Sequence, residues 1–182
     1  FDGTHLAERP EKWAHAQNDA LGAFLWIYCQ MVAAEAIRPA PAAWSVLVDI
    51  PAMLRSVQFW QDEDSGHWEE TRKIASSSIG VAVAGLQALR SLFDNPKYEY
   101  ALAKYGRGIE TWEVDWLIHQ GRAALARQLP AECAQAHPSQ HRRYDAALLF
   151  LVYPYRVVDD AMADQIVSEV VEHLAGPIGI RR

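Results

Sequence analysis

One polar stretch combines the side chains that acid–base chemistry needs. The sequence "SGHWEETRKIASSSIG" (residues 65–80) places Trp68, Glu69 and Glu70 directly before an apolar run. Burial against apolar rings raises the pKa of a carboxyl group and suits it to act as a general acid. Because adjacent residues point in different directions, Glu69 and Glu70 are not expected to face each other as an acid and base pair. One could serve as the acid while the other binds hydroxyl groups.

A second stretch repeats this arrangement. In "KWAHAQNDALGAFLW" (residues 12–26), His15, Asn18 and Asp19 precede another apolar run. The structural alternative is that Asp19 and the glutamates favour helix N-termini, where a carboxylate is stabilised by the helix dipole. We interpret His15 as a structural hydrogen-bond donor.

Three other patterns have mainly structural interpretations. The serines at 76–78 have no Asp–His pair nearby in the sequence, so helix capping and close packing are favoured over a nucleophile site. The "DEDSG" run at 62–66 fails the EF-hand pattern, because His67 and Lys73 stand where Gly and Glu are required; only a non-EF ion site stays open. The "RRYD" run at 142–145 predicts an Arg–Asp ion pair that fixes a helix start.

The composition limits the classes of partner. The 182 residues are 51% hydrophobic and carry a net charge of −6 without a basic cluster, which argues against nucleic acid as a partner. Seven Trp and seven Tyr could fill a core or line a sugar site. We interpret Trp13 and Trp26 as packing residues.

Cysteine usage and hydropathy bear on metal sites, disulfides and the cellular compartment. Cys29 lies in an apolar run and is expected to be buried. With only Cys133 besides, no zinc or disulfide framework is indicated. No membrane span or signal peptide is visible, so we expect a cytoplasmic protein without a membrane partner. The oligomeric state is not predicted.

The apolar periodicity is helical almost throughout. Pro51 should kink or split the helix that contains it, and Asp160 is a suitable cap for the last helix. No run of alternating apolar residues indicates a strand, so we predict an all-α fold of six or seven helices in antiparallel pairs. The predicted helices span 18–36, 42–60, 76–93, 98–104, 109–127, 144–153 and 161–174.

The polar clusters "HAQND", "HWEE" and "RRYD" all lie at the N-terminal ends of apolar helices. A simple bundle buries side chains along the helix axes, whereas a closed ring of helix pairs gathers helix ends around a central pocket. This placement favours the ring.

Together with "HLAGPIGIRR", these clusters resemble the glucoamylase-like proteins of glycoside hydrolase family 15. The resemblance is stronger to the branch with bacterial homologues and the phosphorylase kinase α and β regulatory chains. The motifs occur in order across residues 1–182. The resemblance implies an (α/α)6 toroid, and we expect residues 1–182 to form part of one such catalytic-type domain, incomplete in this chain.

The resemblance also implies roles for individual residues. It matches Glu69 to the general acid and Glu70 to a substrate-binding carboxylate, with Trp68 in the apolar wall. It matches Asn18 and Asp19 to a pair that binds glucose hydroxyls, although many family members have Arg at the position of Asn18. Arg182 is expected to line the same pocket.

The implied function is inverting hydrolysis that releases glucose from the non-reducing ends of α-glucans or α-glucosides. Inversion needs an acid and a base about 6.5–9.5 Å apart, and no residue of this chain matches the base of the family, so we expect the base to lie outside it. The alternative is a non-hydrolytic glucan-sensing or regulatory domain. Carboxylates and water suffice for this chemistry, so no cofactor and no metal are expected.

Overall fold

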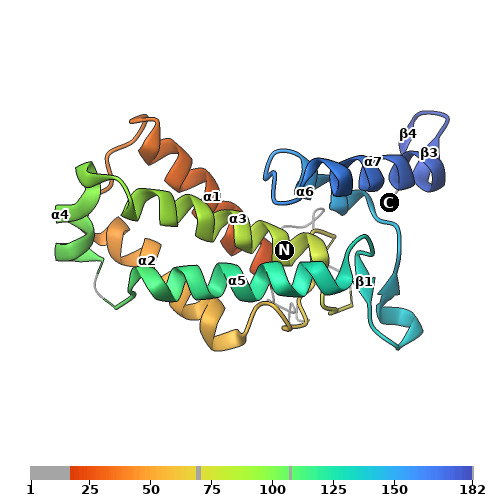
Figure 1. Ribbon diagram of the computed structural model, residues 1–182, viewed down its shortest axis with the longest axis horizontal. Helices are drawn as coiled ribbons and strands as arrows, with labels where there is room; N and C mark the ends of the chain where they lie inside the picture. The colour runs from red at the N-terminus through yellow and green to blue at the C-terminus, as the bar shows by residue number, and fades with distance from the viewer. Residues whose placement is uncertain (1–16, 69–70, 107, 182) are drawn as a thin grey trace, which may run out of the picture.

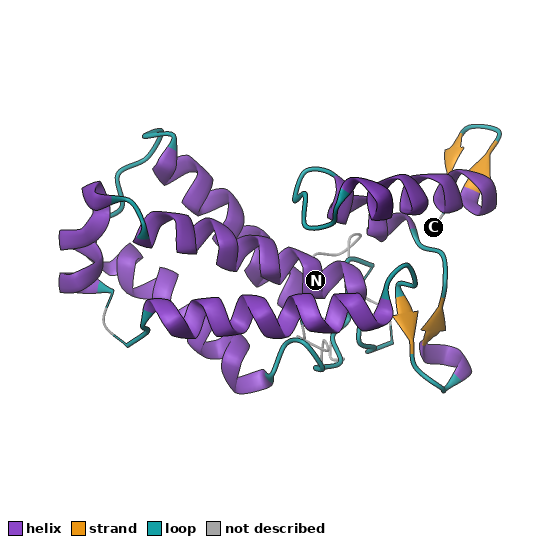
Figure 2. Cartoon of the chain, in the orientation of Figure 1, coloured by secondary structure: helices purple, strands orange, loops and turns teal. Residues whose placement is uncertain are grey.

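The computed structural model describes residues 17–68, 71–106 and 108–181 as an elongated all-α assembly with seven α-helices in the described part (Figures 1 and 2). Four two-residue strands form two short antiparallel hairpins. In chain order, the elements are α1 (Asn18–Ala33), α2 (Pro41–Val57), α3 (Ser76–Phe93), α4 (Pro96–Tyr105), α5 (Thr111–Gln128), β1 (Cys133–Ala134), η1 (Pro138–Gln140), β2 (His141–Arg142), η2 (Ala146–Leu148), α6 (Leu149–Val152), α7 (Asp160–Leu174), β3 (Ala175–Gly176) and β4 (Gly179–Ile180).

The all-α prediction is confirmed, and its errors are local. Helix α2 continues through Pro51, so of the two predicted effects of this proline, a kink or a split, the split is wrong. The predicted helix at 144–153 is instead a 3-10 turn followed by the short helix α6. The cap of α7 is Asp159, not Asp160, because the Asp159 carboxylate accepts the backbone N–H of Met162 at 2.9 Å. A cap side chain must precede the first helical residue, and Asp160 is already within the helix.

Helices α1 and α3 are parallel and unusually close (Figure 1). A Cβ atom on Gly22 would lie 2.6 Å from the backbone N of Ala82, and one on Gly85 would lie 2.6 Å from the carbonyl O of Gly22. Because glycine has no Cβ atom, the two backbones can touch here. Gly22 meets Ala82, and Leu25, further along α1, meets Gly85, further along α3, so the two helices run in the same direction. The N-termini of α1 and α3 therefore lie at the same end of the molecule.

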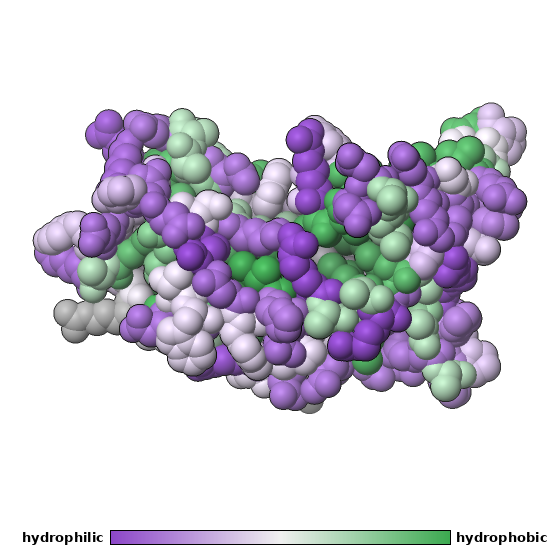
Figure 3. Space-filling model, in the orientation of Figure 1, coloured by the Kyte–Doolittle hydropathy of each residue, from purple (hydrophilic) through white to green (hydrophobic). Residues whose placement is uncertain are grey.

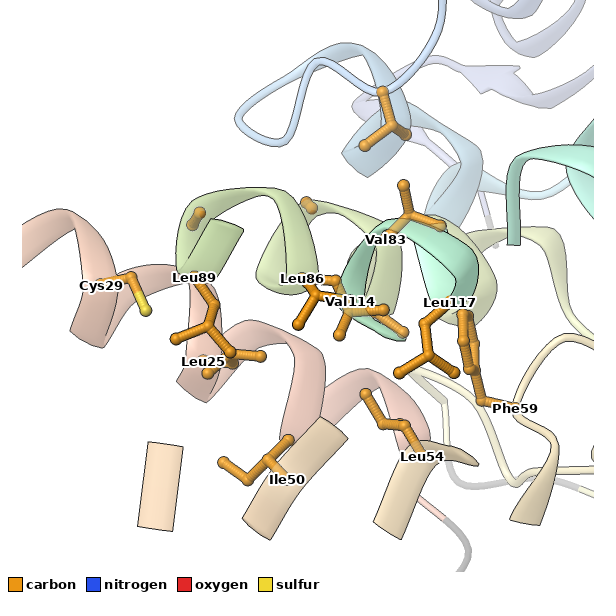
Figure 4. Close-up of a cluster of buried hydrophobic side chains, with 14 of the residues drawn as sticks. Leu25, Cys29, Ile50, Leu54, Phe59, Val83, Leu86, Leu89, Val114 and Leu117 are labelled. Carbon is orange, nitrogen blue, oxygen red and sulfur yellow. The ribbon is translucent and has the colours of Figure 1, made fainter. Parts of the chain in front are cut away.

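Helix α3 is the centre of the core. Residues 75–86 are buried without a break. Figure 4 shows the surrounding cluster, in which α1, α2 and α5 contribute Leu25, Leu54 and Leu117. Each of these leucines is buried, and full burial of one such side chain stabilises the fold by about 2 kcal/mol. The core thus fixes the position of the α3 N-terminus. Polar residues before and after α3 in the chain pack against this end of the helix.

Within the described ranges, no helix is long and apolar enough to cross a membrane. Cys29 is buried as predicted, and Cys133 is buried as well; both thiols are free, and burial raises the pKa of each to about 12.

Candidate functional site

His67 and Trp68, the described residues of the "HWEE" motif, lie on a loop that is closed at its base. Asp64 and Lys73 exchange two backbone hydrogen bonds, with N···O distances of 3.0 and 2.9 Å, just before α3 begins. Between them, the chain makes a turn at Gly66, which has a φ of +62° that glycine adopts without strain. The loop thus places His67 beside Asp19 of α1 and Gly66 beside Ser78 of α3.

The first contact joins this loop to α1. Nδ1 of His67 lies 3.6 Å from Oδ2 of Asp19. Among the described residues, neither Nδ1 of His67 nor Oδ1 of Asp19 has a hydrogen-bond partner, although both atoms are buried. The imidazole also stacks on Phe150 of α6, with ring centroids 4.7 Å apart and an angle of 21°. Burial lowers the pKa of His67 and outweighs the opposing effects of Asp19 and Asp145.

The second contact joins the loop to the "RRYD" segment. The indole N–H of Trp68 donates to Oδ1 of Asp145 at 2.7 Å. Arg142 donates to Oδ2 of Asp145 at 2.7 Å, and the backbone N–H of Ala147 donates to Oδ1 at 2.8 Å. Asp145 is completely buried, so these charge-assisted bonds are strong. They confirm the predicted Arg–Asp pair at a helix start and extend it to Trp68.

Aromatic side chains that the sequence did not single out border the same region. Tyr155 meets the half-buried Trp26 edge to face, with centroids 5.0 Å apart, and lies 6.3 Å from Phe150. Burial, together with the charge of Asp19, raises the pKa of Tyr155. Trp26 packs against the core as predicted. The only sequence signal for Phe150 and Tyr155 was the surplus of aromatic residues, which does not identify positions.

Asn18 and Asp19 point to different neighbours. The Asn18 amide is buried and donates to Oδ2 of Asp62 at 2.9 Å. Asn18 also lines a hollow of about 330 Å³ with Met53, Asp62 and Arg72, among others. The structure therefore places Asp19 with His67 but commits the Asn18 amide to Asp62.

A buried carboxyl group lies beneath the loop. Asp64 is only 1% exposed, and both of its carboxyl oxygens have no hydrogen-bond partner of normal geometry in the described chain. Burial raises its pKa to about 7; the Ser78 hydroxyl opposes this shift, while the charges of Asp19 and Asp62 add to it. A carboxyl group in this setting is partly protonated near neutral pH.

A second buried carboxyl group holds the α3 N-terminus. Glu132 accepts the Ser77 hydroxyl at 2.5 Å and the Ser77 backbone N–H at 3.1 Å. Burial raises its pKa to about 8 despite these bonds and the charge of Lys73. The Ser76 hydroxyl donates to the carbonyl O of Ala131 at 2.8 Å. The predicted capping role of the serines is wrong, because α3 has no side-chain cap and the Ser76 and Ser77 hydroxyls donate to the 131–132 segment instead. The close packing of all three serines is confirmed by their burial.

Several predicted residues lie outside the described residues, namely Trp13, His15, Glu69, Glu70 and Arg182. Their roles stay predictions. The structure brings together Asp19, His67, Trp68 and Asp145, which come from all three polar clusters. Of these, His67 and Asp145 were not predicted as site residues.

Two further hollows lined by described residues do not offer a comparable set of groups. A hollow of about 520 Å³ lies at the opposite end of α3, bounded by Phe93, Leu102 and Glu110. Another of about 370 Å³ lies between α5 and α7, lined mainly by Leu125, Val157 and Met162, and Figure 3 shows hydrophobic surface there. No group of three metal-ligating side chains is assembled anywhere in the described ranges.

Comparison with known proteins agrees with this geometry. The family model described as glycosyl hydrolases family 15 matches residues 2–176. A relative named "Probable phosphorylase b kinase regulatory subunit alpha", from Caenorhabditis elegans, is 27% identical over 186 aligned positions. The alignment covers 93% of this chain but only 14% of that protein. No solved structure matches. The helices described above are those of part of an α/α toroid.

Proposed function

Because the chain belongs to glycosyl hydrolases family 15, we propose that it binds the non-reducing end of an α-glucan or α-glucoside and takes part in its hydrolysis with inversion. Glu69 would protonate the departing glycosidic oxygen, and Glu70 and Asp19 would accept hydrogen bonds from sugar hydroxyls. The base that activates water is assigned to none of the described residues.

One observation carries this proposal. Asp19 has a buried carboxylate oxygen without a described partner, and it lies 3.6 Å from His67, the first residue of the "HWEE" motif. An unsatisfied buried acceptor is costly unless a ligand or water supplies a hydrogen. A sugar presents many hydroxyl hydrogens, and the rings of Phe150 and Tyr155 nearby suit its apolar faces.

The test uses the full-length protein with maltooligosaccharides. We expect release of glucose whose first-formed anomer is inverted relative to the α-linkage, followed by NMR. The Glu69→Gln variant should lose this activity and keep its fold, as judged by circular dichroism. Glu99→Gln is the matched control, because Glu99 lies on α4 at the opposite end of α3. Absence of glucose release from the parent, with no difference between parent and Glu69→Gln, would contradict hydrolysis.

A non-hydrolytic glucan-sensing function is the second candidate. It is favoured by the similarity to a protein named as a regulatory subunit. It is also favoured by Asn18, whose amide is bound to Asp62 and where many family members have Arg. Binding of maltooligosaccharides or acarbose without turnover, together with no carboxylate facing Glu69 across the pocket, would support sensing over hydrolysis.

A further inference from the structure

His67 combines three properties that the proposed roles do not use. It lies on the loop next to Trp68, its ring is held on Phe150, and its Nδ1 faces Asp19 at 3.6 Å. That distance is too long for a hydrogen bond, yet Nδ1 of His67 and Oδ1 of Asp19 are both buried without a partner in the described chain. A carboxylate and an imidazole that face each other, and that each carry one buried atom without a partner, can both bond to a single small group that bridges them.

We propose that His67 is a specificity residue of this site, where Nδ1 of His67 and the Asp19 carboxylate together bind one hydroxyl of the terminal sugar, and where protonation of His67 turns the pair into an ion pair that excludes the hydroxyl. The inference rests on the proposed function, because it names a further residue and a form of control for the same site.

The hydrogen-bonding capacity of the groups supports this arrangement. A hydroxyl donates one hydrogen and accepts others, so it donates to Asp19 and accepts from the Nδ1–H tautomer of neutral His67. A carboxylate alone would accept a hydrogen from a hydroxyl, an amine or water alike. The second contact selects a group that also accepts a hydrogen, and ammonium groups cannot do this.

Stacking on Phe150 fixes the orientation of the His67 imidazole relative to Asp19. Phe150 belongs to α6, which packs beside the N-terminal end of α3, where a Cβ atom on Gly80 would lie 2.0 Å from Leu151 (Figure 1). This close contact sets the position of Phe150 and, through stacking, the plane of the imidazole. His67 is therefore oriented by the helices rather than by the loop alone.

The charges around the pair set the direction of the pH effect. Asp19 on α1 and Asp145 at the start of η2 favour the protonated imidazole, whereas burial disfavours it and dominates. The charge of Asp19 also raises the pKa values of its neighbours Tyr155 and Asp64, and Arg142 is bound to Asp145. His67 is thus neutral at neutral pH, and it gains its charge only below the usual pKa of about 6.5.

The pair is tested first without a ligand. NMR titration of the full-length protein should show an imidazole of His67 that titrates below its usual range. Asp19→Asn should lower that pKa further, because it removes a charge that favours the imidazolium. A His67 pKa that is unchanged by Asp19→Asn would overturn the pair.

The ligand test measures maltotriose affinity by calorimetry between about pH 7.5 and pH 5. We expect the parent to lose about tenfold in affinity on acidification, because a charge-assisted contact replaces the contact with the hydroxyl. His67→Gln cannot become charged, so its affinity should stay flat over this range. His67→Phe keeps a ring on Phe150 but no nitrogen, so it should bind weakly at every pH.

His173→Gln is the matched control, because His173 also stacks on an aromatic ring, that of Tyr144 at 3.9 Å, but lies on α7. It should keep the parent pH profile. A His67→Gln variant that loses affinity in parallel with the parent, or a His67→Phe variant that binds like the parent, would overturn the inference. A parent that binds no maltotriose at any pH would instead overturn the proposed function.

Discussion

At the scale of single residues, the site depends on side chains that bond over long distances in the sequence. Trp68 and Asp145 are 77 positions apart, and Asn18 and Asp62 are 44 apart. The sequence indicated that polar clusters at helix N-termini would matter, and three of them do supply contacts to one region. It could not indicate which partners meet, because helical periodicity reports only neighbours three or four positions away.

The indole of Trp68 provides the first residue-scale prediction. Trp68→Phe removes the hydrogen bond to Asp145 and should lower the free energy of unfolding by about 1 kcal/mol. Maltotriose affinity should also fall, because the hydrogen bond that joins the loop to Asp145 is lost. Urea denaturation and calorimetry measure the two effects. Trp112→Phe, at a position that is 66% exposed on α5, is the control and should change neither quantity.

Asp64 provides a second prediction, on pH and stability. Its pKa is about 7 in the fold and about 4 in an unfolded chain, so the folded state binds more protons between these values. The contribution of Asp64 to the free energy of unfolding is therefore largest at low pH. It is lost as the pH rises from about 4 towards 7, and the total loss is on the order of 4 kcal/mol at most.

Asp64→Asn removes that dependence. The variant should gain stability relative to the parent at about pH 8, and the gain should shrink at about pH 5. Thermal unfolding at the two pH values measures this difference. Asp49→Asn, at an exposed position of α2, should show no such pH-dependent gain. If the variant were less stable than the parent by the same amount at both pH values, the Asp64 carboxylate would instead stabilise the fold in its ionised form.

At the scale of the elements, the contact of α1 with α3 positions Asp19. The apolar pattern predicted both helices to within a few residues, because α1 buries one continuous face and α3 is buried on all sides over its first half. It predicted antiparallel pairing, which holds for α3 with α5: Arg90 near the end of α3 bonds to Asp115 near the start of α5 at 2.8 Å. The parallel contact of α1 with α3 is between helices that are not consecutive, and Gly22 and Gly85 mark it only once the structure is known.

Gly22→Ala tests this contact. The added methyl group would lie within 2.7 Å of the backbone of Val81 and Ala82, which cannot move aside as a flexible side chain could. The two helices must separate, at a cost of about 1–3 kcal/mol, and Asp19 should move away from His67. Thermal unfolding and maltotriose affinity should both decrease. Gln30→Ala, at an exposed position of the same helix, should leave both nearly unchanged; an equal loss there would mean that the contact has no special role.

At the scale of the whole molecule, the all-α fold and the family were predictable because many weak signals agree over the full chain. The ordered motifs gave the family, and the match to residues 2–176 bears it out. The distinction between hydrolysis and sensing was not predictable, because it depends on a carboxylate opposite Glu69. The chain spans 14% of the length of the regulatory subunit to which it is similar.

The most direct measurement is a crystal structure of the full-length protein with maltotriose bound. The account predicts that the terminal glucose lies between Asp19, His67 and the carboxyl group of Glu69, within hydrogen-bonding distance of each. A maltotriose molecule bound elsewhere, or Asp19 and Glu69 on opposite sides of the molecule, would contradict it.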